Sequence, residues 1–185
     1  MLEKIVHEAE EKMKKAVEFT RQELAKLRTG KATLALLDDI RIDYYGQKLP
    51  VAQVATLNTP DAHLITIQPW DKSILAEIEK AIQAANIGLN PANDGTMIRL
   101  PVPPLTEERR KEIVKIAKKF IEDGKISVRN IRRDSNEHLK KAEKDEHVSE
   151  DERKRGEAEV QKLTDKYVKA LDDLFAAKEK EIMEV

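Results

Sequence analysis

The stretch Val128-Arg129-Asn130-Ile131-Arg132-Arg133 lies within residues 106–147, a long segment with no proline and a single glycine. At about 100° per residue, the apolar side chains of this segment fall on one side of a helix and its cations on roughly the opposite side. The apolar set is Ile113, Ile116, Ala117, Phe120, Gly124, Val128, Ile131 and Ala142. The cationic set, called the cationic ridge below, is Lys111, Lys118, Lys125, Arg129, Arg132 and Arg133. We therefore predict a long helix with one buried face and one basic face.

The cationic ridge has two interpretations. Its three arginines favour phosphate recognition, because a planar guanidinium binds two phosphate oxygens at once. A basic stretch can also be no more than a solvated surface, since 37% of the residues in this chain are charged. The pattern alone leaves both interpretations open.

Composition restricts the possible classes of protein. The 185 residues suffice for one domain or two small ones, and 34 basic against 35 acidic side chains give a net charge of −1. Any nucleic-acid surface must therefore be local. The chain has no cysteine, which excludes disulfides and thiolate chemistry and suits a reducing cytosol. No apolar run approaches the roughly 20 residues that span a bilayer, and the charged N-terminus does not resemble a signal peptide.

The sequence predicts two further long helices, one before and one after the segment 106–147. Residues 1–29 carry apolar side chains at spacings of three and four, and Gly30 then suits a left-handed position at the helix end. Ser149 and Glu152 form a capping-box sequence before a third helix that runs to near Val185. Three long helices with one apolar seam each predict an antiparallel three-helix bundle.

The region between the first two helices has a different composition, since it contains all seven prolines. Alternating or β-rich runs predict strands at residues 40–44, 51–58, 64–67 and 97–100, and a helix at 71–86 closed by Gly88. We therefore predict an α+β protein in which a small β/α/β domain, residues 31–104, is inserted into a bundle of residues 1–30 and 105–185.

Two short segments connect the predicted domains. They are Gly30-Lys31 and Pro103-Pro104-Leu105. Short connections let domains reorient, and glycine adopts a positive φ at little cost, so we predict a hinge at these residues.

No catalytic constellation is visible in the sequence. The four histidines are scattered, and the glycines form no phosphate-binding loop. We therefore expect no enzymatic activity, no metal and no cofactor.

Several motifs, in order along the chain, resemble the bacterial ribosome recycling factor family. They are Arg28-Thr29-Gly30-Lys31-Ala32, Tyr44-Tyr45-Gly46, Ile87-Gly88-Leu89-Asn90-Pro91, Asp94-Gly95, the run from Leu100 to Arg110, and the run from Val128 to Asp134. One position departs from the family, which often has proline near Leu34. Leucine there makes the entry to the small domain less stiff.

The resemblance implies an L-shaped molecule that binds the large ribosomal subunit after termination and acts with elongation factor G, whose GTP hydrolysis drives subunit separation. It implies contacts to ribosomal RNA from Arg28, Arg129 and Arg132, and we add Arg110, Lys125 and Arg133 as candidates. We expect a cytoplasmic monomer with no membrane association. The alternatives are a helical scaffold or chaperone, and a factor that silences ribosomes without recycling them.

Overall fold

The computed structural model describes residues 1–145 and 147–184, which divide into two compact units. Unit 1 comprises Met1–Leu27 and Arg110–Val185, and unit 2 comprises Arg28–Arg109. Long helices and a small antiparallel sheet confirm the predicted α+β class. Each unit has its own buried core and is described by itself below.

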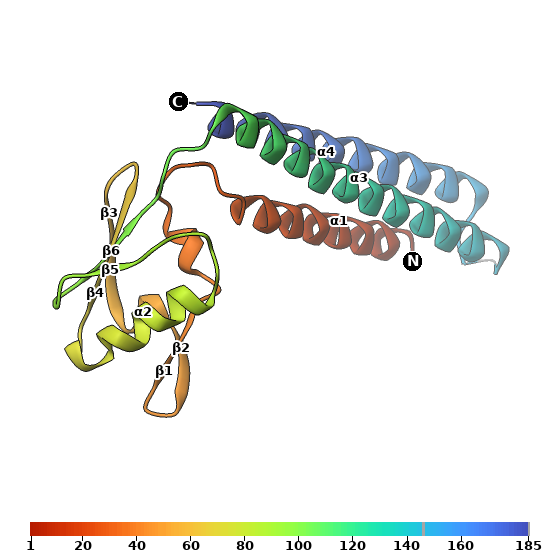
Figure 1. Cartoon of the computed structure of the whole chain (residues 1–185). Coiled ribbons are helices and arrows are strands. Elements are labelled where there is room, and N and C mark those ends of the chain that lie inside the picture. The colour runs from red at the N-terminus through yellow and green to blue at the C-terminus, as the bar shows by residue number, and fades with distance from the viewer. Residues whose placement is uncertain (146, 185) are drawn as a thin grey trace. The chain divides into compact units, whose positions relative to one another are not determined.

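Unit 1 is built from three long helices that lie side by side in Figure 1: α1 (Leu2–Ala25), α3 (Glu107–Lys144) and α4 (Glu150–Met183). Gly124 of α3 lies against Thr20 of α1 and Leu171 of α4. Further along the bundle, Gly156 of α4 lies against Leu2 of α1 and Leu139 of α3. From the first of these layers to the second, residue numbers fall in α1 and α4 and rise in α3. The helix α3 is therefore antiparallel to the other two, as predicted.

The helices pack closely at these two glycines. A Cβ atom added to Gly156 would lie 2.4 Å from Cδ1 of Leu2 and 2.9 Å from Cδ2 of Leu139. Both positions therefore use the missing side chain to let three helices pack at one point.

Two polar contacts from α4 meet at Glu10 of α1, one of them from Lys166, whose Nζ lies 3.5 Å from Oε1 of Glu10. The Tyr167 hydroxyl donates a hydrogen bond to Oε1 of Glu10 at 3.0 Å. Burial, and then this hydrogen bond, raise the pKa of Tyr167 to about 12, and the same bond is the main cause of the lowered pKa of Glu10. The Tyr167–Glu10 hydrogen bond is charge-assisted and adds a directional contact to the packing of the two helices.

The helices α3 and α4 both begin at side-chain caps. Thr106 Oγ1 accepts from the backbone N–H of Arg109 at 3.2 Å at the start of α3. At the start of α4, Ser149 Oγ accepts from the N–H of Glu152, and the Glu152 carboxylate accepts from the N–H of Ser149 at 2.8 Å. The predicted capping box is confirmed.

The first helix is shorter than predicted. It ends at Ala25 and not at residue 29. Gly30 has the expected positive φ of 78°, but it lies five residues beyond the end of α1 and so does not cap that helix. The buried side of α3 also differs from the prediction, because Ile121, Ser135 and Leu139 are buried and Ile116 is 38% exposed.

Unit 2 holds more strands than the predicted β/α/β arrangement. A hairpin of β1 (Arg41–Tyr44) and β2 (Gln47–Pro50) stands beside a four-stranded antiparallel sheet. The order in that sheet is β3 (Ala55–Asp61), β4 (Leu64–Pro69), β6 (Ile98–Pro101) and β5 (Ala92–Asn93). The single α-helix is α2 (Leu75–Ala84), and short 3₁₀ turns cover Leu34–Leu37, Val51–Gln53 and Lys72–Ile74.

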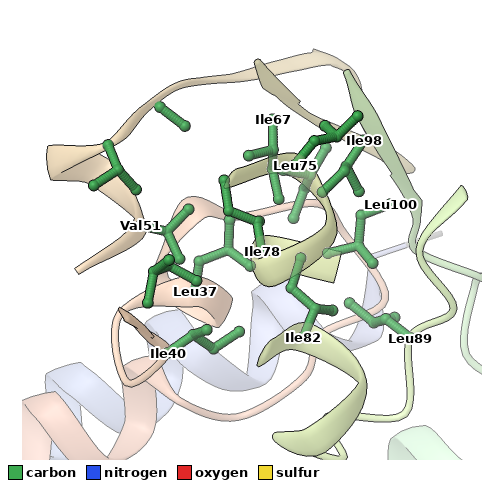
Figure 2. Close-up of a cluster of buried hydrophobic side chains, with 14 of the residues drawn as sticks. Leu37, Ile40, Val51, Ile67, Leu75, Ile78, Ile82, Leu89, Ile98 and Leu100 are labelled. Carbon is green, nitrogen blue, oxygen red and sulfur yellow. The ribbon is translucent and has the colours of Figure 1, made fainter. Parts of the chain in front are cut away.

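The core of unit 2 lies between α2 and the sheet. Figure 2 shows Ile78 and Ile82 of α2 pointing toward Ile67 of β4 and toward Ile98 and Leu100 of β6. All five side chains are fully buried. Inward residues alternate along β6, where Ile98 and Leu100 are buried and Arg99 is exposed, so one face of the sheet meets the helix and the other meets solvent.

Three local predictions in unit 2 are wrong. Residues 51–53 form a 3₁₀ turn and not part of a strand, and β3 continues through Pro60 to Asp61. Proline is tolerated there because β3 is an edge strand whose outer N–H groups need no partner. At the end of α2, Asn86 rather than Gly88 takes the left-handed position, with φ of 49° next to the C-cap Ala85.

Candidate nucleic-acid interface

The cationic ridge runs along the solvent side of α3, on residues of unit 1 only. Arg129 and Arg133 are exposed, and Lys125 and Arg132 are half-buried at the edge of the ridge that faces α4. The division follows from helix geometry, since Lys125 and Arg132 lie on the flank of α3 that turns toward its neighbour.

The cations in the central part of the ridge, from Lys125 to Arg133, differ in what holds them. Lys125 Nζ lies 2.5 Å from Oδ1 of Asp172 on α4 and 3.7 Å from Oε1 of Glu122. Arg132 donates from Nη1 to Oε1 of Gln161 on α4 at 3.2 Å. These two side chains already bridge helices, so each would have to exchange a partner to bind an external phosphate.

The remaining two arginines are better placed for an external ligand. Arg133 donates from Nη2 to the side-chain oxygen of Asn130 at 3.0 Å, which orients its guanidinium along the helix surface. Arg129 lies one helical turn before Arg133. Within residues 1–145 and 147–184, its side chain makes neither a hydrogen bond nor an ion pair. Arg129 therefore has no partner to give up to an incoming phosphate. The same holds for the exposed Lys118 of this ridge, but only the arginine offers a planar, bidentate donor.

Arg28 lies in unit 2 and not on α1. It is three residues beyond the last residue of α1 and is half-buried. A Cβ atom on Gly88 would lie 3.0 Å from Nη1 of Arg28, and Gly88 has φ of 76°. Gly88 therefore does not cap α2 as predicted. Its missing side chain instead leaves room for the Arg28 guanidinium.

Two candidate arginines carry a buried donor without a partner. Among the described residues, Nε of Arg28 and Nε of Arg110 have no hydrogen-bond acceptor, and neither does the hydroxyl of the buried Thr29. Unpaired buried polar groups cost free energy, and a native structure normally supplies water or a ligand to them. Arg28 and Arg110 therefore remain candidates for binding, each within its own unit.

The predicted hinge residues are all inside unit 2. Gly30 packs closely on Leu105, because a Cβ on Gly30 would lie 3.0 Å from both Cγ and the backbone N of Leu105. The segment that follows Gly30 is tied down by Ala32, whose N–H donates to the carbonyl of Ala62 at 2.6 Å. The returning segment is tied to the same β-turn by Val102, whose N–H donates to the carbonyl of His63 at 2.8 Å.

The hinge at these residues stays a prediction. Lys31, Pro103 and Pro104 belong to unit 2 together with Gly30 and Leu105, and the divisions between units fall after Leu27 and after Arg109.

Two absences apply to the described part of the chain. No group of three or more acidic or histidine side chains is arranged to hold a metal ion. No helix in the residues searched is long and apolar enough to cross a bilayer.

Comparison with known proteins gives consistent matches. The family model described as ribosome recycling factor matches residues 20–183. The ribosome-recycling factor of Symbiobacterium thermophilum is 58% identical over 185 residues, which is 100% of both chains. A solution structure of the ribosome recycling factor is 47% identical with a TM-score of 0.83, and covers 100% of this chain and 98% of its own. A further match, 43% identical with a TM-score of 0.68 and covering 100% of both chains, comes from models of the T. thermophilus ribosome recycling factor and the E. coli elongation factor G bound to the E. coli post-termination complex.

Proposed function

The chain belongs to the ribosome recycling factor family, and from this premise we propose that it is a translation factor of the post-termination ribosome. It binds the large subunit and, together with elongation factor G and the GTP hydrolysis of that partner, separates the subunits for a new round of translation. The support is full-length similarity to named recycling factors and to a recycling factor described with elongation factor G on the post-termination complex.

The observation that carries the proposal is the unengaged Arg129 on the cationic ridge. A guanidinium without an internal partner binds phosphate with little loss of existing contacts. Arg133 supports it one turn away, and Lys125 and Arg132 contribute positive potential while they are bonded to α4. The ridge is local, which fits a chain with a net charge of −1.

The proposal assigns different tasks to the protein and its partner. This protein binds the ribosome, obstructs the association of its subunits and catalyses no reaction. Elongation factor G supplies the free energy for their separation. It works as a monomer in the cytoplasm, and its contacts on the ribosome are to ribosomal RNA through Arg28, Arg110 and the cationic ridge.

A subunit-splitting assay tests the function directly. Post-termination 70S complexes, elongation factor G and GTP are mixed with the protein, and subunits are resolved by light scattering or sedimentation. We expect splitting that depends on all components. Binding without splitting would identify a ribosome-silencing factor, and absence of binding would leave a helical scaffold.

Arginine variants test the interface. Arg129→Ala should weaken ribosome binding by about 1.5–3 kcal/mol, the usual worth of a charge-assisted hydrogen bond. The matched control is Arg155→Ala, which removes an exposed arginine of α4 and should change binding little. The thermal unfolding of both variants should match the parent, because exposed substitutions usually alter stability by less than about 0.5 kcal/mol.

Salt titration adds an independent measurement. If three or four phosphates are neutralised, log K against log salt should slope by roughly −2 to −4. Loss of Arg129 should flatten the slope by about one, and Arg155→Ala should leave it unchanged. A flat slope in the parent protein would contradict binding through ribosomal RNA.

A further inference from the structure

Acidic and amide side chains of α4 line the edge of the cationic ridge. They follow one another at separations of four or seven residues, so they share one flank of α4. The set, called the acidic flank below, is Gln161, Asp165, Asp172 and Glu179. Glu179 shares a pocket of about 390 Å³ with Lys111 of the ridge. One cation, Lys154, lies on the same flank and is paired with Glu150 at 2.9 Å. The free side of this flank is therefore acidic beside a basic helix.

The Asp172 carboxylate holds Lys125 where the ridge meets α4. Nζ of Lys125 lies 2.5 Å from Oδ1 of Asp172 and 3.7 Å from Oε1 of Glu122. Lys169, one turn before Asp172, forms no ion pair with it within residues 1–145 and 147–184. Two carboxylates therefore share one ammonium group, and they reduce its attraction for a phosphate from outside.

An amide holds Arg132 in a similar way. Nη1 of Arg132 donates to Oε1 of Gln161 at 3.2 Å, and Nε2 of Gln161 donates to Oδ1 of Asp165 at 2.9 Å. The bond to Asp165 orients the amide group, so that its oxygen faces the arginine. Asp165 thus acts on Arg132 through Gln161.

The pair of Lys125 and Asp172 is placed for exchange. The side chain of Lys125 is only 14% exposed, whereas that of Asp172 is 56% exposed, so solvent reaches the ion pair from the side of the carboxylate. Exposed ion pairs contribute little to stability, because solvent screens them and both side chains lose entropy. A phosphate oxygen accepts from an ammonium group as a carboxylate oxygen does, so it can take the place of Asp172.

We propose that Asp172 is an internal competitor of RNA phosphate for Lys125, with Gln161 in the same role at Arg132. RNA meets Arg129 first, displaces the two α4 side chains to engage the whole ridge, and is displaced by them when it leaves. The acidic flank thereby lowers the affinity of the ridge and shortens the lifetime of the complex. The inference rests on the proposed function for RNA as the ligand, and it assigns to α4 the release of a factor that must leave after each round.

Two substitutions with the same change in net charge test this role. Asp172→Asn removes the charge of the competitor and keeps its shape, and Asp173→Asn is the matched control. Leu171 is fully buried and Asp173 is exposed, so the control side chain points about 100° further around α4, into solvent. The removed charge is thus close to Lys125 in one variant and distant in the other.

Binding is measured to purified large ribosomal subunits and to a short RNA duplex. Two unit charges about 5 Å apart in water repel by an energy that corresponds to roughly fourfold in affinity. We therefore expect Asp172→Asn to bind both ligands about three- to fivefold more tightly than Asp173→Asn, mainly through slower dissociation. Its slope of log K against log salt should be steeper by about one, because Lys125 then neutralises a phosphate. Unfolding curves establish that both variants are folded.

A charge-neutral variant extends the test to Arg132. Gln161→Ala removes the second competitor and should raise the affinity for the RNA duplex by about two- to threefold, the usual worth of one hydrogen bond. A lower affinity would show that Gln161 orients Arg132 for binding, and would overturn its role as a competitor.

The outcomes separate the inference from the proposed function. Equal affinities, dissociation rates and salt slopes for Asp172→Asn and Asp173→Asn would overturn the inference and leave Asp172 as a structural partner of Lys125. Tighter binding of Asp172→Asn to the RNA duplex, by a protein that does not bind large subunits, would support the competitor role and contradict the proposed function.

Discussion

At the scale of single residues, Leu34 occupies a position whose backbone geometry suits proline. It is the first residue of a 3₁₀ turn, after Thr33, whose φ of −137° and ψ of 139° suit the residue that precedes a proline. The Leu34 side chain is 38% exposed, so little packing would be lost.

We predict that Leu34→Pro stabilises the protein by about 0.4–1 kcal/mol, because proline lowers the entropy of the unfolded chain. Denaturant unfolding followed by a probe in unit 2 measures the change. The control Leu34→Ala lacks the ring and should stabilise nothing. A destabilised proline variant would show that the Leu34 N–H or its φ matters more than the turn geometry indicates.

Gly156 illustrates the opposite situation, a residue whose replacement is sterically blocked. Alanine favours a helix by about 1 kcal/mol over glycine, but overpacking typically costs about 1–3 kcal/mol. Since a Cβ would lie 2.4 Å from Leu2 Cδ1, we predict that Gly156→Ala lowers the free energy of unfolding. Combining it with Leu2→Ala should recover part of the loss. Additive effects in that double-mutant cycle would assign the cost to another contact.

At the scale of elements, the capping box of α4 couples helix stability to pH. The backbone N–H of Ser149, followed by its side chain, holds the pKa of Glu152 below the ordinary value of 4.5. A lowered pKa means that this contribution to stability is complete above about pH 4.5 and is lost as pH falls through the folded-state pKa.

Thermal melts between pH 7 and pH 3 test this coupling. Ser149→Ala should cost about 0.5–2 kcal/mol at pH 7, and less at pH 3, where the carboxylate is protonated. Glu152→Gln should retain a hydrogen bond to Ser149 and be less sensitive to acid. Equal destabilisation of Ser149→Ala at both pH values would contradict the linkage.

The sequence predicted elements well where one local signal dominated. The three helices and the α4 cap follow from periodicity and side-chain chemistry, and the structure confirms them. The early end of α1 was not predictable, because Lys26, Leu27 and Arg28 are good helix formers. Packing in unit 2 decides that boundary, since Thr29 and Gly30 are buried there.

The candidate site was predicted in part: the position of its cations was predicted, and their bonding partners were not. Helix periodicity placed the cationic ridge, but it could not show that Lys125 meets Asp172 or that Arg132 meets Gln161, because both partners come from α4. A groove between α1 and α3, lined by Phe19 and Phe120, was missed for the same reason. Phe120 was assigned to the buried face from its spacing, and only the packing of α1 shows that it lines an open surface beside Phe19.

At the scale of the whole molecule, anchoring and action should be separable. The cationic ridge belongs to unit 1, while unit 2 has a core of its own. We predict that replacing residues 31–104 with a flexible Gly/Ser linker yields a folded bundle that binds ribosomes within about tenfold of the parent, or about 1.4 kcal/mol. This deletion keeps Arg28 and the Thr106 cap of α3.

The same variant should compete with the parent protein and fail to split subunits in the presence of elongation factor G and GTP. Circular dichroism establishes that its helices are formed. Splitting by the folded bundle would show that unit 2 is dispensable, and loss of binding by the folded bundle would move the anchor into unit 2.

The division of the chain into two units also sets the order in which its parts can fold during synthesis. Unit 2 is one continuous stretch, so all of its partners have been synthesised once residue 109 is added. The helix α1 is made first, yet its buried side chains pack on α3 and α4, and α4 ends at Met183. At about 5–20 residues per second, α1 waits roughly 8–30 seconds for that partner. During this interval its apolar face, with Leu2, Met13 and Leu24, is unprotected, and a nascent-chain chaperone would find its target at the N-terminus rather than in the domain that folds in between.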